Sequence, residues 1–297
     1  MSDGVVELEP RVRRRTLGFR RNLFRVLLLL PAMSISALLV VSILIIARLS
    51  LNQWSSAGGT VEAWTLENYA TALTDPFLHR AFANTFQISI IVTLVALVLG
   101  YPVAYLLARA RYKGIILFFV FLPLLVDVLI RAFGWMVLLA SNGIVNRFLV
   151  FTDLLDSPTR FIGTQTAVIL EMIHEVLPFM ILAIAGVVQR IDPYIEEAAV
   201  GLGAGRLRTF FLVTLPLSMP GIIAGTLLAF SVAVSAFVAP LVLGGGRVLM
   251  ISIVIQQQMS LLLNWAAGSA QTIILVAIVS IVLFGYATLV REKRVEE

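Results

Sequence analysis

The chain has 297 residues, of which 60% are hydrophobic and only 13% are charged. A soluble globular chain is closer to half apolar and a quarter charged, so this composition excludes an ordinary soluble domain and favours a protein that lies in a bilayer. Cysteine is absent and the net charge is +5, which excludes a disulfide framework, a thiolate metal site and a cysteine nucleophile.

Six apolar runs are long enough to cross a membrane, since a spanning helix needs about 20 residues. The first run lies between Arg25 and Arg48, at residues 26–47, and the second lies at residues 81–108. The sequence predicts four further spans, at about 114–140, 162–187, 217–241 and 268–290. We therefore expect an all-α integral membrane protein with six transmembrane helices.

The predicted spans form one membrane domain, residues 26–290, between a basic tail at 1–25 and a short tail at 291–297. The first run follows a basic tail, as a signal peptide would. Its 22 uncharged residues exceed a typical signal core and no small-x-small cleavage site follows, so we expect an uncleaved first span. The connection at 48–80 has aromatic side chains that suit the membrane interface or a short surface helix.

The basic residues predict the orientation of the chain, because cytoplasmic loops of membrane proteins are rich in Lys and Arg. Six spans put both termini on one side. Sixteen basic residues lie on that side and five lie on the other, while Arg131 is inside a span. Both tails and the loop at about 190–216 are therefore expected to be cytoplasmic. Since the charges follow topology, nucleic-acid binding is not expected.

The loop at 190–216 differs from its apolar neighbours. Asp192 is expected to cap a short helix that begins at Pro193. Glu196 and Glu197 fall in its first turns, where the helix dipole favours anions. Glycines then end this helix, and a second helix leads from about residue 206 to Pro216. The simplest interpretation is a solvated loop, although such a bend can also present a surface to another protein.

The stretch EAAVGLGAGRLRTFFLVTLP resembles the signature of binding-protein-dependent ABC importer permeases. That signature reads Glu-Ala-Ala, three residues, Gly, nine residues, Ile, one residue, Leu-Pro. Val213 replaces the Ile, and the other matching residues are Glu197, Ala198, Ala199, Gly203, Leu215 and Pro216. In the family this loop is the coupling helix, which sits in a cleft of an ATP-hydrolysing subunit. The resemblance thus implies an ATPase-coupling role for these residues and for the neighbouring Glu196 and Arg206.

The resemblance extends over roughly residues 65–290. The stretches LENYATAL, LPLLVDVLIRAFGW, AVILEMIHEVLPFM and LPLSMPGIIAG are similar to the spermidine/putrescine-type branch. This implies a type I ABC importer permease in the bacterial plasma (inner) membrane, with both termini cytoplasmic. It also implies import of a small organic solute, such as a polyamine or a related amine or opine-like compound.

The implied partners are a second permease that forms a heterodimer, two ATP-binding subunits, an external solute-binding protein and membrane lipid. No phosphate-binding G-x-x-x-x-G-K-[ST] motif and no H-E-x-x-H motif is present in the sequence. We therefore expect no catalytic residue, metal site or cofactor in this chain. ATP and Mg are expected on the partner ATPase.

Ionisable residues inside predicted spans are candidates for the substrate path. Asp127 and Arg131 are four residues apart, so they are expected to face the same side of the third span, where they can pair. Glu171 and Glu175 have the same spacing in the fourth span, where His174 can supply a cation between them. The first set is either a structural ion pair or a wall or gate of the path, and the second is either a self-satisfied polar cluster or a transient site for a cationic solute.

Two alternatives remain open at this stage. Polyamine members of the family tend to carry an acid late in the fifth span, whereas this chain reads SAFVAPLVLGG there. Phe237 is a candidate apolar gate and Pro240 a candidate helix break, and the solute can then be non-cationic. In a different class, an ion-coupled secondary transporter can use Glu171, His174 and Glu175 as a proton relay.

Overall fold

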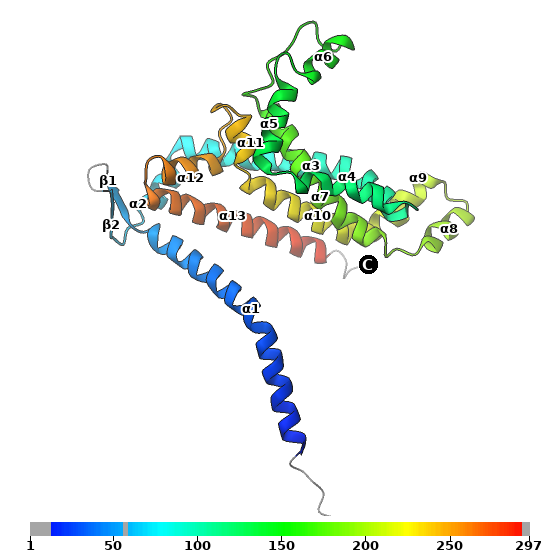
Figure 1. Cartoon of the computed structure of the whole chain (residues 1–297), viewed down its shortest axis with the longest axis horizontal. Helices are drawn as coiled ribbons and strands as arrows, with labels where there is room; N and C mark the ends of the chain where they lie inside the picture. Colours follow the sequence, from blue (N-terminus) through cyan, green and yellow to red (C-terminus); the bar gives the residue numbers. More distant parts are fainter. Residues whose placement is uncertain (1–12, 56–58, 293–297) are drawn as a thin grey trace, which may run out of the picture.

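The computed structural model describes residues 13–55 and 59–292, which are almost entirely helical (Figure 1). In chain order the elements are α1 (Arg13–Leu49), β1 (Gln53–Ser55), β2 (Gly59–Val61), α2 (Glu67–Thr74), α3 (Pro76–Arg109), α4 (Lys113–Leu125), α5 (Val128–Leu139), α6 (Ile144–Phe151), α7 (Gln165–Val188), α8 (Pro193–Gly201), α9 (Arg206–Thr209), the π-helix η1 (Phe210–Thr214), α10 (Leu215–Ser235), α11 (Val238–Val242), α12 (Ile251–Ser260) and α13 (Trp265–Glu292).

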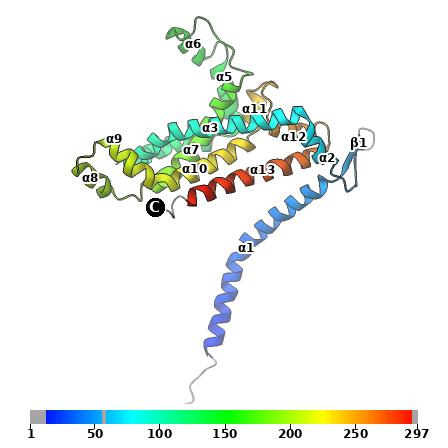
Figure 2. The ribbon, with the colours of Figure 1, turned by 180° about the vertical axis from the view of Figure 1, so that it is seen from behind.

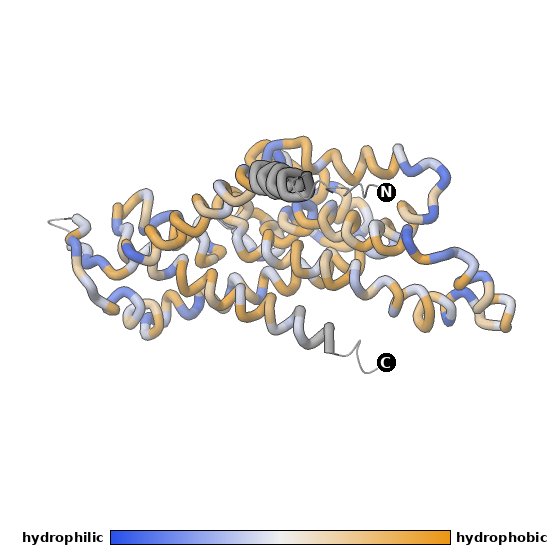
Figure 3. The backbone as a smooth tube through the Cα atoms, turned by 90° about the horizontal axis from the view of Figure 1, so that it is seen from below, coloured by the Kyte–Doolittle hydropathy of each residue, from blue (hydrophilic) through white to orange (hydrophobic). Residues whose placement is uncertain are grey.

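The core of the molecule is a bundle in which α7 packs against both α3 and α10, with α13 alongside α10 (Figures 1 and 2). Ile88 and Val92 of α3 meet Met172 and Val176 of α7 in one buried cluster. The outward faces carry exposed Leu, Val, Ile and Phe side chains. Apolar residues follow the lengths of the helices in Figure 3, as expected for surfaces that face lipid.

Small residues let the central helices approach closely. A Cβ atom built on Gly221 of α10 would lie 3.0 Å from the backbone of Ile184 in α7. One built on Gly225 would lie 2.8 Å from the sulfur of Met180, and one on Gly100 of α3 would lie 3.2 Å from Cγ of the same Met180. Met180 therefore fills the space that two glycines leave on either side of α7, the usual way to pack helices tightly in a membrane.

Six helical segments are long and apolar enough to span a membrane, which confirms the predicted number, but the bounds of two predicted spans were wrong. The predicted third span, 114–140, is broken after Leu125 into α4 and α5, and the segment that meets the length and hydropathy criteria is Val128–Phe151, which itself contains the turn between α5 and α6. The fifth, predicted at 217–241, runs instead from Arg206 to Ser235. The hydropathy of these runs is continuous, so hydropathy alone does not reveal where the backbone turns.

The two ends of the bundle differ. α8 and α9 lie at one end, together with the described end of α13, and the β1–β2 hairpin, α2 and α12 lie at the other (Figure 1). The helix α1 meets α13 near the hairpin and then runs away from the bundle (Figures 1 and 2). It begins at Arg13, well before the predicted start at 26, while residues 1–12 and 293–297 of the predicted tails lie outside the described residues.

Candidate coupling site and intramembrane ionic cluster

The short helix α8 has the local structure that its sequence predicts. The Asp192 carboxylate accepts a hydrogen bond from the backbone N–H of Tyr194 at 3.0 Å, and Pro193 occupies the first turn. The chain turns after Gly201, and Gly203 adopts a φ of +90°, a conformation that glycine adopts without strain. The second helix begins at Arg206, as predicted.

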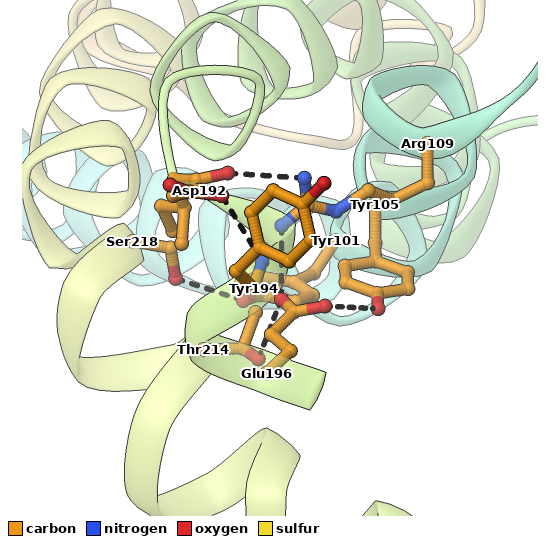
Figure 4. A network of polar contacts seen from close by, with 9 residues as sticks. Tyr101, Tyr105, Arg109, Asp192, Tyr194, Glu196, Thr214 and Ser218 are labelled. Carbon is orange, nitrogen blue, oxygen red and sulfur yellow. Dashed lines mark hydrogen bonds and ion pairs between the residues drawn. The ribbon is translucent and has the colours of Figure 1, made fainter. Parts of the chain in front are cut away.

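The two carboxylates of α8 have different surroundings. Glu197 is exposed, whereas Glu196 turns inward toward the bundle (Figure 4). The Glu196 carboxylate receives hydrogen bonds from Arg109 Nη2 at 3.1 Å, Tyr105 Oη at 3.1 Å and Thr214 Oγ1 at 2.9 Å. We call Glu196 and these three donors the α8 clamp. It joins α8 to the end of α3 and to η1, and Arg109 extends it by donating to the carbonyl oxygen of Ile191 at 3.0 Å.

The π-helix η1 carries the chain from α8 and α9 into the bundle. Its Phe210 ring meets Tyr101 of α3 edge-on, with centroids 5.3 Å apart and an interplanar angle of 88°. Below it, the hydroxyls of Tyr101 and Ser218 lie 2.8 Å apart. Aromatic and polar contacts thus hold η1 against α3, so α8, α3 and α10 form one connected unit. π-Helical turns inside α-helices occur frequently at functional sites.

The outer surface of this region is unusually apolar for a helix end outside the bundle. α8 contributes no buried residue. Large side chains are exposed on α8, on the following turn and on α9. They are Tyr194, Leu202 and Leu207, of which Leu202 is the most exposed, at 90%. Apolar side chains that project from a polar loop commonly mark a protein contact.

A second set of charges lies within the bundle. Arg131 of α5 donates from Nε to Glu171 Oε1 at 3.0 Å, and its Nη2 lies 3.3 Å from Glu175 Oε1. The exposed fractions of the Arg131 and Glu171 side chains are only 8% and 0%. Arg131 also donates to the carbonyl oxygen of Pro123 at 3.2 Å. These three ionisable residues, the intramembrane cluster, therefore join α4, α5 and α7.

The pairing predicted within this set was wrong. Asp127 is the N-cap of α5, where its carboxylate accepts from the backbone N–H of Leu129 at 2.8 Å, and the Arg131 side chain pairs with Glu171 and Glu175 instead. The Asp127 carboxylate turns back to the start of its own helix, so it is not directed at the Arg131 side chain even though the Asp127 carbonyl accepts from the Arg131 N–H at 3.0 Å. The cation between the two glutamates is Arg131 and not His174, whose Nδ1 accepts from Trp135 Nε1 at 3.2 Å.

The end of α10 also differs from the prediction for Pro240. The helix ends at Ser235, and the chain is extended at Ala236, whose carbonyl oxygen accepts from Ser252 Oγ at 2.8 Å. Pro240 is buried inside the separate helix α11, so the break precedes it. Phe237 lies at this break and is 44% exposed. Its role as a gate stays a prediction.

Comparison with known proteins identifies the family of the chain. Residues 96–296 match the family described as "Binding-protein-dependent transport system inner membrane component". The chain belongs to this family. It is a multi-pass membrane protein and the permease subunit of an ABC importer.

Two curated relatives lie in the polyamine branch. The permease is 38% identical over 224 residues to the "Spermidine/putrescine transport system permease protein PotB" of Haemophilus influenzae, which covers 75% of this chain and 78% of the relative. It is 36% identical over 237 residues to the protein of the same name from Escherichia coli K12, with 78% and 86% covered. These matches confirm the predicted branch.

The solved structures confirm the fold. A chain of a bacterial alginate ABC transporter, in complex with an alginate pentasaccharide-bound periplasmic protein, matches with a TM-score of 0.76. The match covers 95% of the permease and 98% of that chain at 18% identity. The permease therefore has the predicted type I importer architecture.

Sequence reasoning missed three members of the α8 clamp. Tyr105, Arg109 and Thr214 were not among the candidate residues, and Arg109 served only as a topology signal. A usable signal was present, because Tyr101, Tyr105 and Arg109 are spaced by four and place a polar stripe along one face of an otherwise apolar helix end.

Proposed function

We propose that the permease imports a polyamine or a related small cation, as one half of a heterodimeric path driven by two ATPase subunits. The observation that carries this proposal is the identity of 36–38% to permeases named for spermidine and putrescine, over three quarters of the chain. An external solute-binding protein delivers the solute. The site of action is the bacterial inner membrane, with both termini and α8 cytoplasmic.

ATP and Mg are held by the partner ATPase, and this chain contributes movement instead of chemistry. In our proposal α8 docks in a cleft of the ATPase subunit through its exposed face, which includes Glu197 and Leu202. The α8 clamp supports this role, because three hydrogen bonds to Glu196 tie the docked helix to α3 and η1. Movement of α8 is then passed to α10 as a rigid displacement.

A charge reversal at Glu197 tests the coupling. Glu197→Lys leaves the α8 clamp intact but places a like-signed or unpaired charge in the docking contact, which typically costs 2 kcal/mol or more, roughly thirtyfold in affinity. We expect the ATPase activity stimulated by the loaded binding protein to fall at least about tenfold in proteoliposomes. Glu62→Lys, at an exposed site at the other end, is the control. Full stimulated activity in Glu197→Lys would refute the coupling role.

The intramembrane cluster is the proposed contact for the cationic solute. One guanidinium faces two carboxylates there, so the three groups have a formal charge of −1, and Glu171 Oε2 has no partner among the described residues. Such a group attracts a cation that passes along the path. Glu175→Gln removes the excess negative charge and keeps the Arg131–Glu171 pair, so it is expected to raise the putrescine concentration for half-maximal uptake while the complex still assembles.

Uptake of labelled putrescine and spermidine by the reconstituted complex decides the substrate class. Competition by polyamines, but not by sugars or oxyanions, is the expected result. Saturable uptake of a neutral or anionic solute in place of polyamines would contradict it and leave the cluster a structural role. Uptake without any ATPase subunit would favour the secondary transporter.

A further inference from the structure

A polar pocket lies at the end of the bundle opposite α8, where β1, α2, α12 and α13 meet. Its volume is about 270 Å³, somewhat below the range of about 300–1,000 Å³ typical of drug-sized ligand sites. Among its lining residues are Trp54, Glu67, Asp75, Gln258 and Gln271. Two of these belong to segments that the transport mechanism above does not use, the glutamine-rich α12 and the start of α13.

The pocket has an unbalanced negative charge. Glu67 and Asp75 supply two carboxylates, and no Lys, Arg or His is among the described residues that line it. One oxygen of Asp75 accepts from the N–H of Phe77 at 2.8 Å, so the carboxylate is held in place. The nearest basic residues in sequence are engaged elsewhere, since His79 Nε2 lies 2.7 Å from the carbonyl oxygen of Leu73 and Arg80 donates to that of Pro76 at 3.3 Å.

Two buried amide oxygens in the pocket lack a donor. The side chain of Gln271 is only 3% exposed, and its Oε1 has no hydrogen-bond partner among the described residues. The Oε1 of Gln258, from the neighbouring helix, is buried and unpartnered in the same way. Buried acceptors in folded proteins are nearly always paired, so these two amide oxygens, beside two carboxylates, are suited to a donor that enters the pocket.

We propose that this pocket binds an alkylammonium group. An ammonium offers three N–H donors and a positive charge, which match the bare amide oxygens and the carboxylates, and the Trp54 ring adds a surface that attracts cations. The described residues gather no set of three His, Cys, Asp or Glu for a metal ion, which favours an organic cation. The ammonium can come from the solute itself or from a lysine side chain of the binding protein. Both sources rest on the proposed function, whereas the chemistry of the pocket is independent of it.

Equilibrium binding of labelled putrescine to the complete complex in nanodiscs, without binding protein, tests the pocket. The background variant Arg131→Leu/Glu171→Gln/Glu175→Gln removes the intramembrane cluster as a second site and leaves no charge there unpaired. Adding Glu67→Gln with Gln271→Leu is expected to weaken binding at least tenfold, and Glu62→Gln to leave it unchanged. Since Gln271 is buried, Glu67→Gln alone is the variant that cannot fail through misfolding, and it is expected to weaken binding about threefold or more.

Competition defines the chemistry. Methylammonium is expected to displace putrescine, whereas tetramethylammonium, which has no N–H, is not. The assignment would be overturned by equal displacement with tetramethylammonium or Mg²⁺, or by unchanged binding in the pocket variants. It would also be overturned if no saturable binding were found, since water would then be the occupant of the pocket.

Two further measurements separate the sources of the ammonium. Weaker docking of the solute-free binding protein to Glu67→Gln assigns it to a lysine of that partner. Unchanged docking with a higher putrescine requirement for uptake assigns it to the solute. Normal putrescine uptake without any effect of the pocket variants refutes this inference alone, while ammonium binding without polyamine uptake refutes the proposed function alone.

Discussion

The α8 clamp and the intramembrane cluster are both built on an arginine paired with glutamate, but they differ in burial and in hydrogen bonding. In the clamp, Arg109 and Glu196 are 21% and 16% exposed, and Glu196 accepts three hydrogen bonds. In the cluster, Arg131 and Glu171 are almost fully buried, and one oxygen of Glu171 has no partner among the described residues.

The difference shows two uses of one ion pair. In the clamp the carboxylate is fully engaged and the buried atom without a partner in the described part of the chain is a donor, Arg109 Nε, so the pair fixes the position of its helix and has no acceptor left for a cation. A buried pair with excess acceptors costs more to maintain, and it keeps a place for a positive charge. Variants that remove one partner at a time therefore have effects of different size in the two regions.

The largest effect is expected at Arg131. Arg131→Leu leaves two carboxylates buried without their cation, and breaking a buried pair in this way costs about 3–5 kcal/mol. We expect strongly reduced yield of the assembled complex and a lower midpoint of thermal unfolding in detergent.

Neutralising the carboxylates as well tests the physical reason. In Arg131→Leu/Glu171→Gln/Glu175→Gln no charge is left unpaired, so much of the lost thermal stability is expected to return. A triple variant as unstable as Arg131→Leu would show that packing of the arginine, and not its charge, stabilises the site.

Glu196→Ala is expected to have the next largest effect, because it removes three hydrogen bonds at once. The pair is partly exposed, so the free energy of unfolding falls by about 2 kcal/mol at most. Stimulated ATPase activity is expected to fall more than stability does. Glu196→Gln retains the shape and part of the hydrogen bonding, and it should lie between Glu196→Ala and the unmodified permease in both measurements.

Tyr105→Phe sharpens the comparison inside the clamp. It deletes one donor to Glu196 and keeps the ring beside Phe210, with centroids 6.5 Å apart. A loss of about 1 kcal/mol in thermal unfolding is expected, together with partly reduced coupling. A loss as large as that of Glu196→Ala would mean that the tyrosine hydroxyl, and not the arginine, carries most of the contact.

The smallest effect is expected at Asp127, which lies next to the cluster in sequence but caps α5. Asp127→Ala loses the cap and about 1 kcal/mol, whereas Asp127→Asn keeps a good cap and is expected to be neutral. Because the two side chains share no partner among the residues that the structure describes, the cost of Asp127→Ala should add to that of Arg131→Leu within about 0.5 kcal/mol, although the residues are neighbours on one helix. A clear departure from additivity would show that Asp127 interacts with the intramembrane cluster.

Much of the fold could be predicted from the sequence, because hydropathy and helix caps act along the chain. The number of spans and the capped helix after Asp192 both follow from local patterns. The breaks after Leu125 and Ser235 were not predicted, since the runs on both sides of each break are apolar and a single charge such as Asp127 is compatible with a continuous span. A proline and a cap mark the first break, but Pro123 still lies within α4 and Pro240 lies beyond the second break.

The candidate sites were harder to predict from the sequence, because the residues that contact one another come from different helices. Spacing along one helix correctly placed Glu171 beside Glu175, yet it paired Asp127 with Arg131 and missed that Arg131 reaches across to α7. The motif located α8, but its connection to Arg109 joins residues 87 positions apart in sequence. Such contacts depend on how the helices cross, which no local pattern states.

The π-helix η1 also sets the direction in which α8 and α9 point relative to α10. A π-helical turn contains one residue more than an α-helical turn, and one residue corresponds to about 100° of rotation about the helix axis. The arm formed by α8 and α9 therefore points in a direction that a regular helix from Arg206 to Ser235 would not give it. If the same residues formed a regular α-helix, the arm would be turned through about that angle, so its direction depends on the hydrogen-bonding pattern of Phe210–Thr214 as much as on residue identity.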